Sequence, residues 1–172
     1  YVLSGSSVVR EVRNGATRAT YLLGVRGPEY RRDDSAGAIR WYVFDGLGSV
    51  VAEVDPAGNV TASRGYDVYG LERGSNGTPT STNKFVGSLG HSSEDETGLV
   101  YMRARYMDPS TGRFCSEDIA YHGSNWYLYC RDNPVGRKDA SGKEDLAEVL
   151  FSSGQACGID GSLDGLGLKT LE

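Results

Sequence analysis

The chain has 172 residues, of which 24 are glycine and 11 are tyrosine, against four phenylalanines and two tryptophans. With only short aliphatic runs, this balance excludes a helical bundle or a coiled coil, and no stretch reaches the ~18 apolar residues that a membrane span needs. Eighteen basic against 23 acidic residues give a net charge of −5, which excludes the basic surface typical of nucleic-acid-binding proteins. We therefore expect an all-β protein that binds no nucleic acid and has no membrane span.

Two segments of the chain follow one pattern, residues 1–24 and residues 42–70. Each has a tyrosine, a glycine, the run Ser-Val-Val-x-Glu-Val, a turn, and a second strand that closes on tyrosine and glycine. Apolar side chains alternate along the run, which is the periodicity of a strand. In the second segment Pro56 and Gly58 suit the turn, because proline fixes φ and glycine accepts a positive φ. The pattern predicts a β-hairpin in each segment.

The connecting segments are expected to be less regular. Residues 26–40 and residues 70–83 are polar and rich in turn-forming residues, so we expect a loop or long hairpin tip in the first and a loop in the second. Residues 125–131 alternate large apolar side chains and predict a buried strand. Residues 144–151 carry acids that would stabilise the first turn of a short helix. They belong to an acidic C-terminal extension, residues 143–172, with two lysines and six acids.

Successive hairpins make an open sheet with unpaired edges, which natural proteins seldom leave exposed. Such a sheet must curl, close or continue into further repeats. The chain also opens within a strand, at Tyr1-Val2-Leu3, without a methionine or a signal peptide. We therefore expect the chain to be a segment of a longer, repetitive β-sheet protein.

The repeats and the block that follows them share a series of motifs. The motif Tyr-Asp-x-x-Gly occurs at residues 66–70 and, with phenylalanine in place of tyrosine, at residues 44–48. Residues 84–142 then carry Thr-Gly-Leu-x-Tyr-x-Arg-Ala-Arg-Tyr, Asp-Pro-x-x-Gly-Arg-Phe and Asn-Pro, in that order. In these motifs the chain resembles the Rhs/YD-repeat family, and the later block resembles its repeat-associated core. The resemblance covers about residues 1–142.

The resemblance implies an all-β fold in which antiparallel β-hairpin repeats form part of a curled or spiral sheet, with a short irregular or helical tail. It divides the chain into hairpin repeats at residues 1–83, the core at residues 84–142 and a variable extension at residues 143–172. Members of the family form β-shells in bacterial polymorphic toxins, in the C subunits of Tc toxins and in teneurins. The implied role is structural, as the wall and end plug of a shell around a C-terminal effector. The implied partners are the rest of a secreted or cell-surface, bacterial parent polypeptide and that effector.

Two other roles stay open. In many members of the family the core is an aspartyl autoprotease, in which one aspartate keeps a proton while the other activates water. The residues implied for this role are Asp118 and Asp139 as the catalytic pair, Arg103 and Arg105 as the nearby basic residues, and Gly142, Lys143 and Glu144 as the cleavage region. The other role is a surface filament or adhesion protein, whose exposed sheet edges add strands from neighbouring copies.

The sequence departs from the family's pattern at both aspartates. Asp118 is followed by neither proline nor glycine in register, and the second motif has Ala140 in place of proline and Lys143 in place of leucine. A pocket made for leucine would have to bury an ammonium group, which is costly without a partner. The departures favour the alternative in which both aspartates cap turns. The structural role therefore comes first and the enzymatic role second.

The remaining chemistry-bearing residues predict no further site. Cys115, Cys130 and Cys157 lack the spacing of a zinc site, so we expect small buried or half-buried side chains, with a Cys115–Cys130 disulfide as the alternative in an exported protein. His91 and His122 are expected to be surface loop residues. The sequence has no phosphate loop and no dinucleotide fingerprint. We expect neither a cofactor nor a metal.

Overall fold

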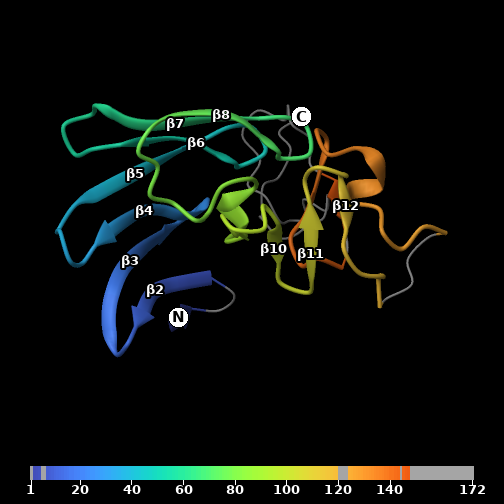
Figure 1. Ribbon diagram of the computed structural model, residues 1–172, viewed down its shortest axis with the longest axis horizontal. Coiled ribbons are helices and arrows are strands. Elements are labelled where there is room, and N and C mark those ends of the chain that lie inside the picture. The colour runs from blue at the N-terminus through green and yellow to red at the C-terminus, as the bar shows by residue number, and fades with distance from the viewer. Residues whose placement is uncertain (1, 5–6, 120–123, 144, 148–172) are drawn as a thin grey trace, which may run out of the picture.

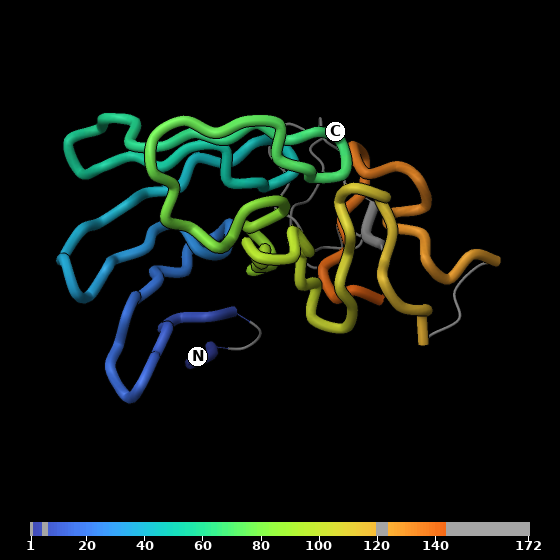
Figure 2. The backbone as a smooth tube through the Cα atoms, viewed as in Figure 1, coloured from blue at the N-terminus to red at the C-terminus, as the bar shows by residue number. Residues whose placement is uncertain are grey.

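The computed structural model describes residues 2–4, 7–119, 124–143 and 145–147, and almost all of its regular structure is antiparallel β-strand (Figure 1). Eight strands form one open, curled sheet in which each strand pairs with its neighbours in the chain. The all-β prediction is confirmed. Figure 2 shows the chain running back and forth through this sheet before it enters a second region.

The eight-stranded sheet, which we call the repeat sheet, is a meander. Its strands are β1 (Val2–Ser4), β2 (Ser7–Arg13), β3 (Ala16–Gly24), β4 (Gly27–Asp33), β5 (Ile39–Phe44), β6 (Val50–Val54), β7 (Val60–Tyr66) and β8 (Glu72–Gly77). The order in the sheet is the order in the chain, so β1 and β8 are its edge strands.

Both predicted hairpins are present. β2 and β3 are joined by Asn14 and Gly15, whose φ values of 52° and 76° are the left-handed pair that a tight hairpin turn requires. β6 and β7 are joined by a turn in which Asp55 Oδ1 accepts the N–H groups of Ala57 and Asn59, each at 2.9 Å. Backbone conformation and one short side chain therefore close these hairpins.

Three connections of the repeat sheet share one Asp-x-x-Gly turn, at residues 45–48, 55–58 and 67–70. In each, the glycine N–H donates to the aspartate carbonyl at 3.0 to 3.1 Å, and the aspartate Oδ1 accepts the N–H of the residue after the glycine at 2.8 to 2.9 Å. The glycines have φ of 86° to 89°. We call this arrangement the aspartate turn; it explains why the repeat motif keeps aspartate and glycine three residues apart.

Two segments contain strands although the sequence predicts a loop or long hairpin tip for the first and a loop for the second. Residues 26–40 include all of β4 and the start of β5, and residues 70–83 include β8. On β4 the Arg31 side chain is only 13% exposed and lies 4.0 Å from Glu11. β8 is exposed along its whole length and pairs with β7. The polar composition hid both strands because backbone pairing, more than apolar burial, holds them in the sheet.

The second region, residues 84–147, is called the core block. It contains a sheet of β9 (Ser92–Ser93), β10 (Val100–Met102), β11 (Arg105–Asp108) and β12 (Arg113–Phe114), a pair of β13 (Arg137–Asp139) and β14 (Asp145–Ala147), and the 3-10 helices η1 (Gly87–Leu89) and η2 (Cys130–Asp132). Its apolar core consists of Phe85, Val86, Val100, Met102, Met107, Phe114, Tyr129 and Cys130. Backbone hydrogen bonds of 2.9 Å, from Val50 N–H to the Lys84 carbonyl and from Ser88 N–H to the Gly48 carbonyl, join the block to the repeat sheet.

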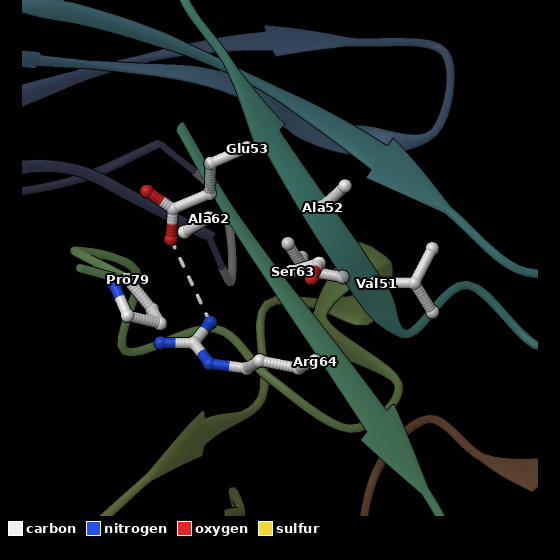
Figure 3. A pocket seen from close by; sticks show the side chains of 8 residues that line it. Val51, Ala52, Glu53, Ala62, Ser63, Arg64 and Pro79 are labelled. Carbon is white, nitrogen blue, oxygen red and sulfur yellow. Dashed lines mark ion pairs between the residues drawn. The ribbon is translucent and has the colours of Figure 1, made fainter. Parts of the chain in front are cut away.

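A buried glutamate ties the connection between the two regions to the repeat sheet. Glu53 on β6 is 1% exposed, and its carboxylate accepts the N–H groups of Thr80 and Ser81, each at 2.9 Å, and the Thr80 hydroxyl at 2.7 Å. Arg64 on β7 lies 3.6 Å from the same carboxylate (Figure 3). Bulges in the pairing of β6 with both neighbours break strict alternation, so Glu53 and Val50 are both buried.

The predicted strand at residues 125–131 is wrong. This segment forms a turn, a single bridge at Leu128 and the start of η2. The Asn125 side chain accepts the Tyr127 N–H at 3.2 Å, and Cys130 has φ of 51°. A side-chain-stabilised turn and a left-handed residue are both incompatible with an extended strand.

The expected helical turn at residues 144–151 is also wrong where the structure describes that segment. Residues 145–147 form β14, antiparallel to β13, because pairing with an available strand outweighs the weak tendency of a short isolated segment to form helix. The rest of that predicted turn, and the rest of the extension after residue 147, lie outside the described residues. Within the described part of the chain, no helix has the length and apolar character needed to cross a membrane.

Candidate functional site

The hairpin tip between β10 and β11 holds the backbone of the predicted cleavage region. Three successive residues of the tip, 103–105, donate hydrogen bonds to three successive carbonyls, those of residues 140–142. The donors are in turn the Arg103 guanidinium, the Ala104 N–H at 3.2 Å and the Arg105 Nε at 2.5 Å. Because all three contacts reach main-chain oxygens, they depend on the path of the backbone and not on the side chains of the segment.

Residues 139–143, which we call the cleavage segment, form an Asp-x-x-Gly turn. The buried Asp139 accepts, on Oδ1, the N–H groups of Ser141, Gly142 and Lys143 at 3.0, 2.7 and 3.2 Å. Gly142 has φ of 72°, and a Cβ at this position would collide with a backbone carbonyl of β10. Only glycine fits here. Asp139 therefore caps a turn, as one of the two sequence-based alternatives predicts.

Arg105 brings the two predicted catalytic aspartates together. Its Nη2 lies 3.9 Å from Asp118 Oδ2 and 3.7 Å from Asp139 Oδ2, and all three side chains are buried. The guanidinium lies over the Phe114 ring, 3.6 Å from the ring centroid, and its Nη1 donates to the Trp126 carbonyl at 3.0 Å. The Asp118 N–H donates to that same carbonyl at 3.0 Å, which fixes Asp118 beside Arg105.

One buried cation thus faces two carboxylates, so the cluster has excess negative charge if both are ionised. Burial raises the pKa of Asp139 above its usual range, although the N–H groups of the turn and the charge of Arg105 oppose the rise. Burial also lowers the pKa of Arg105, against the attraction of Asp118 and Asp139. A proton on Asp139 would relieve the excess charge and supply the acid that such a site needs.

Arg103 joins the site to a buried histidine. It has φ of 63°, and its guanidinium donates to the carbonyls of Ala140 and of Leu89, the latter at 2.7 Å. His91 is fully buried, with Nε2 3.5 Å from the Ala140 carbonyl, so the prediction of a surface residue is wrong. Burial, with the nearby charge of Arg103, lowers the pKa of His91 to about 4. His122 lies outside the described residues.

The histidine is the site residue that sequence reasoning missed. It stands in a glycine- and serine-rich stretch that carries no apolar periodicity. The contact of its side chain is with a residue distant in sequence, since Ala140 lies 49 positions further along the chain. No local pattern could reveal such a contact.

The other residues singled out in the sequence are exposed, buried without a disulfide, or outside the described residues. Lys143 is exposed, so its ammonium need not be buried, and Glu144 lies outside the described residues. Cys115 is exposed and Cys130 is buried, and no disulfide joins them, while Cys157 lies outside the described residues. Across the described ranges, no three His, Cys, Asp or Glu side chains are grouped so as to hold a metal ion.

Comparison with protein-family models finds no match, but individual proteins are similar in sequence. The tRNA3(Ser)-specific nuclease WapA of Bacillus spizizenii is 31% identical over 108 residues, which cover 59% of this chain and 5% of WapA. The double-stranded DNA deaminase toxin A of Burkholderia cenocepacia is 34% identical over 116 residues, which cover 64% of this chain and 8% of the toxin. The chain therefore spans only a small part of the length of these relatives.

Solved structures of a TcdB2–TccC3 complex share the fold. In the crystal structure with Cdc42 the TM-score is 0.63 at 25% identity, covering 72% of this chain and 6% of that chain. In the crystal structure without the hypervariable C-terminal region the TM-score is 0.60 at 24% identity, covering 75% of this chain and 7% of that chain. The chain is similar to Rhs-type toxins. The likeness extends over about three quarters of this chain.

Proposed function

We propose that the chain is a structural segment of an Rhs/YD-repeat protein. The repeat sheet would be part of the wall of a β-shell, residues 84–142 of the core block its end plug, and residues 143–172 a variable extension that begins within the core block. The shell would enclose or present a C-terminal effector. Two similarities support this: sequence relatives that are nucleases or a deaminase toxin, and a similar fold in TccC3 complexes, one of them solved without a hypervariable C-terminal region. We propose on the same ground that the parent protein is bacterial and exported.

The open sheet is the observation that carries this proposal. Among the described residues, eight strands in chain order leave the outer backbone groups of β1 and β8 without a strand partner. A long sheet with two bare edges is a hazard for an isolated protein, and further hairpins would remove it. Hairpins added before β1 would both cover that edge and extend the wall.

The test uses the parent polypeptide with its own C-terminal effector. The effector sequence is expected to resist limited proteolysis when it is attached to the shell, and to be cut much faster when it is expressed alone. Electron microscopy of the same sample should show a hollow particle. Equal cutting rates for attached and isolated effector, together with no hollow particle, would contradict the proposal.

The cluster of Asp118, Arg105 and Asp139 favours a second function, self-cleavage by an aspartyl peptidase in the core near residues 142–144. Arg105 Nε donates to the Gly142 carbonyl and Asp139 Oδ1 accepts the Lys143 N–H, so both residues hold the backbone of this region. In this scheme Asp118 takes a proton from water, and the water oxygen bonds to the carbonyl carbon of the scissile peptide bond within residues 142–144. Protonated Asp139 then delivers its proton to the nitrogen of that bond as the bond breaks.

Intact-mass measurement of the parent polypeptide tests this second function. Cleavage would yield a product that ends within residues 142–144. Asp118→Asn and Asp139→Asn should each abolish it, whereas Asp55→Asn, in an exposed aspartate turn, should not. A single full-length mass that is stable for days and unchanged at mildly acidic pH would contradict self-cleavage, and processing that survives both core variants would exclude the aspartate pair.

Assembly into filaments through the sheet edges remains a prediction. β8 is an exposed edge strand, but its Glu72 and Arg73 form ion pairs with Arg64 and Asp67 along that edge. Charged side chains on an edge oppose the addition of further strands. Size-exclusion chromatography over a range of concentrations is the test, and a monomer throughout would contradict assembly.

A further inference from the structure

His91 is a buried polar group whose position the proposed functions do not explain. It lies between η1 and β9, fully buried, and the Asn83 side chain donates to its backbone carbonyl at 3.1 Å. Its Nδ1 is buried without a hydrogen-bond partner among the described residues. Burying a polar ring with one nitrogen unsatisfied is costly, so a compensating contact is expected at the other nitrogen.

That contact is the carbonyl of the cleavage segment. His91 Nε2 lies 3.5 Å from the Ala140 oxygen, which also accepts a hydrogen bond from Arg103. With no acceptor at Nδ1, the single proton of the neutral ring belongs on Nε2, where it points at this oxygen. The Ala140 carbonyl therefore has two donors from two different parts of the core block.

The second donor distinguishes this carbonyl from its neighbours. The Ser141 and Gly142 carbonyls are each held by the β10–β11 tip, through Ala104 N–H and Arg105 Nε. Only the Ala140 carbonyl is also approached from the η1–β9 connection, among the contacts described for these three carbonyls. It stands at the start of the turn, directly after Asp139, where a small rotation of the backbone would move both the Asp139 carboxylate and the Gly142 carbonyl.

We infer that neutral His91 is a positioning residue, which with Arg103 holds the Ala140 carbonyl and so fixes the cleavage segment against Arg105. The positioning is a property of the core block itself. Its consequence for cutting rests on the proposed self-cleavage. His91 touches neither the predicted scissile bond nor the Asp118–Asp139 pair, so its effect on chemistry would act through the backbone of the segment.

The test compares His91→Leu with His91→Gln in the full 172-residue chain. Leucine removes the donor, whereas glutamine keeps an N–H donor at about the same reach. Amide hydrogen exchange of residues 139–143, followed by mass spectrometry, should speed up by about tenfold in His91→Leu, the equivalent of one net hydrogen bond. His91→Gln should restore exchange most of the way to that of the unmodified chain. Exchange in the hairpins of the repeat sheet should not change, which separates local release from general destabilisation.

A second pair of variants keeps the inference testable if His91→Leu fails to fold. Asparagine and glutamine carry the same amide, but asparagine is too short to reach the Ala140 oxygen. Faster exchange in His91→Asn than in His91→Gln is the expected result, and equal exchange in the two, or unchanged exchange in His91→Leu, would overturn the inference. If the parent polypeptide cuts itself, the cutting rate should follow the same order. If it does not cut, the exchange experiment still decides the role of His91.

Discussion

The repeat sheet and the core block use the same short motif in different surroundings. Asp55 and Asp139 each begin an Asp-x-x-Gly turn, and each Oδ1 accepts the N–H of the residue after the glycine, at 2.9 and 3.2 Å. The Asp55 turn is exposed, and hydrogen bonds from the Asn59 side chain and from backbone N–H groups lower the pKa of Asp55. Asp139 is 2% exposed, and burial raises its pKa.

The comparison shows that the turn and the chemistry are separable. The motif supplies the bend in both places, because one short carboxylate and one glycine with positive φ are enough to make it. A capping aspartate becomes a candidate acid because of its surroundings, which are burial in the core block and a second buried carboxylate, Asp118, near the same Nη2 atom of Arg105. Four experiments test this contrast.

The largest expected effect is that of Arg105→Leu. It leaves two buried carboxylates without their cation and should lower the free energy of unfolding by about 3–5 kcal/mol. Urea denaturation of the chain measures the loss. The matched control is Arg73→Leu, which removes an ion pair with Asp67 from an exposed arginine of the repeat sheet and should cost less than about 1 kcal/mol. Equal losses would show that Arg105 does not hold the core cluster together.

The next effect is a loss of stability in acid that arises from His91. Its pKa falls to about 4 in the folded chain, below the ordinary value of about 6.5 in the unfolded chain. The unfolded state therefore binds the proton more readily. The contribution of His91 to the free energy of unfolding is therefore complete above pH ~6.5 and falls as the pH drops. It levels off below about pH 4, with a total loss of up to about 3 kcal/mol.

Urea denaturation between pH 7 and pH 4 measures this loss. His91→Gln cannot titrate, so its stability should depend less on pH over the same range. A variant that loses as much stability as the unmodified chain would show that other groups cause the acid sensitivity.

Substitution of the glycine should cost more stability in the buried Asp139 turn than in the exposed Asp55 turn. A Cβ on Gly142 would meet a backbone carbonyl, whereas a Cβ on Gly58 would meet open space. Both have positive φ, so Gly58→Ala should cost about 1 kcal/mol from backbone strain, and Gly142→Ala about 2–3 kcal/mol from strain and collision together. Thermal or urea unfolding distinguishes the two. Similar costs would mean that the core turn shifts to accommodate a side chain.

The smallest of the four effects is expected at Glu53. Glu53→Gln removes the charge that faces Arg64 and part of the acceptor capacity for Thr80 and Ser81, and should cost about 2 kcal/mol. The control is Glu72→Gln, because Glu72 also pairs with Arg64 but is more exposed, and it should cost less than about 1 kcal/mol. A larger loss in the control would mean that the buried carboxylate does not anchor the connection to the core block.

The hairpins and their turns could be predicted because their causes are local. Alternating side chains at residues 50–54 and the Pro56 and Gly58 turn act over a few residues, and the structure contains the expected hairpin. β4 and β8 could not be predicted in this way, because neighbouring strands supply the backbone partners that hold them. The formation of β14 has the same cause: β14 pairs with β13, a strand partner that the local sequence does not reveal, although the sequence predicts a helical turn for its residues.

At the candidate site, too, some features follow from the sequence and others only from contacts between distant residues. The sequence alone predicts an all-β chain of repeated hairpins and a turn at residues 55–59, and it carries a family resemblance that singles out Asp118, Asp139, Arg103 and Arg105. Three features required the folded structure: Arg105 Nη2 lies 3.9 and 3.7 Å from the two aspartates, residues 103–105 donate to the carbonyls of residues 140–142, and buried His91 approaches the Ala140 carbonyl. The physical reason is range. Strand periodicity and turns depend on neighbouring residues, whereas burial, charge pairing and pKa depend on contacts made across dozens of residues once the chain has folded.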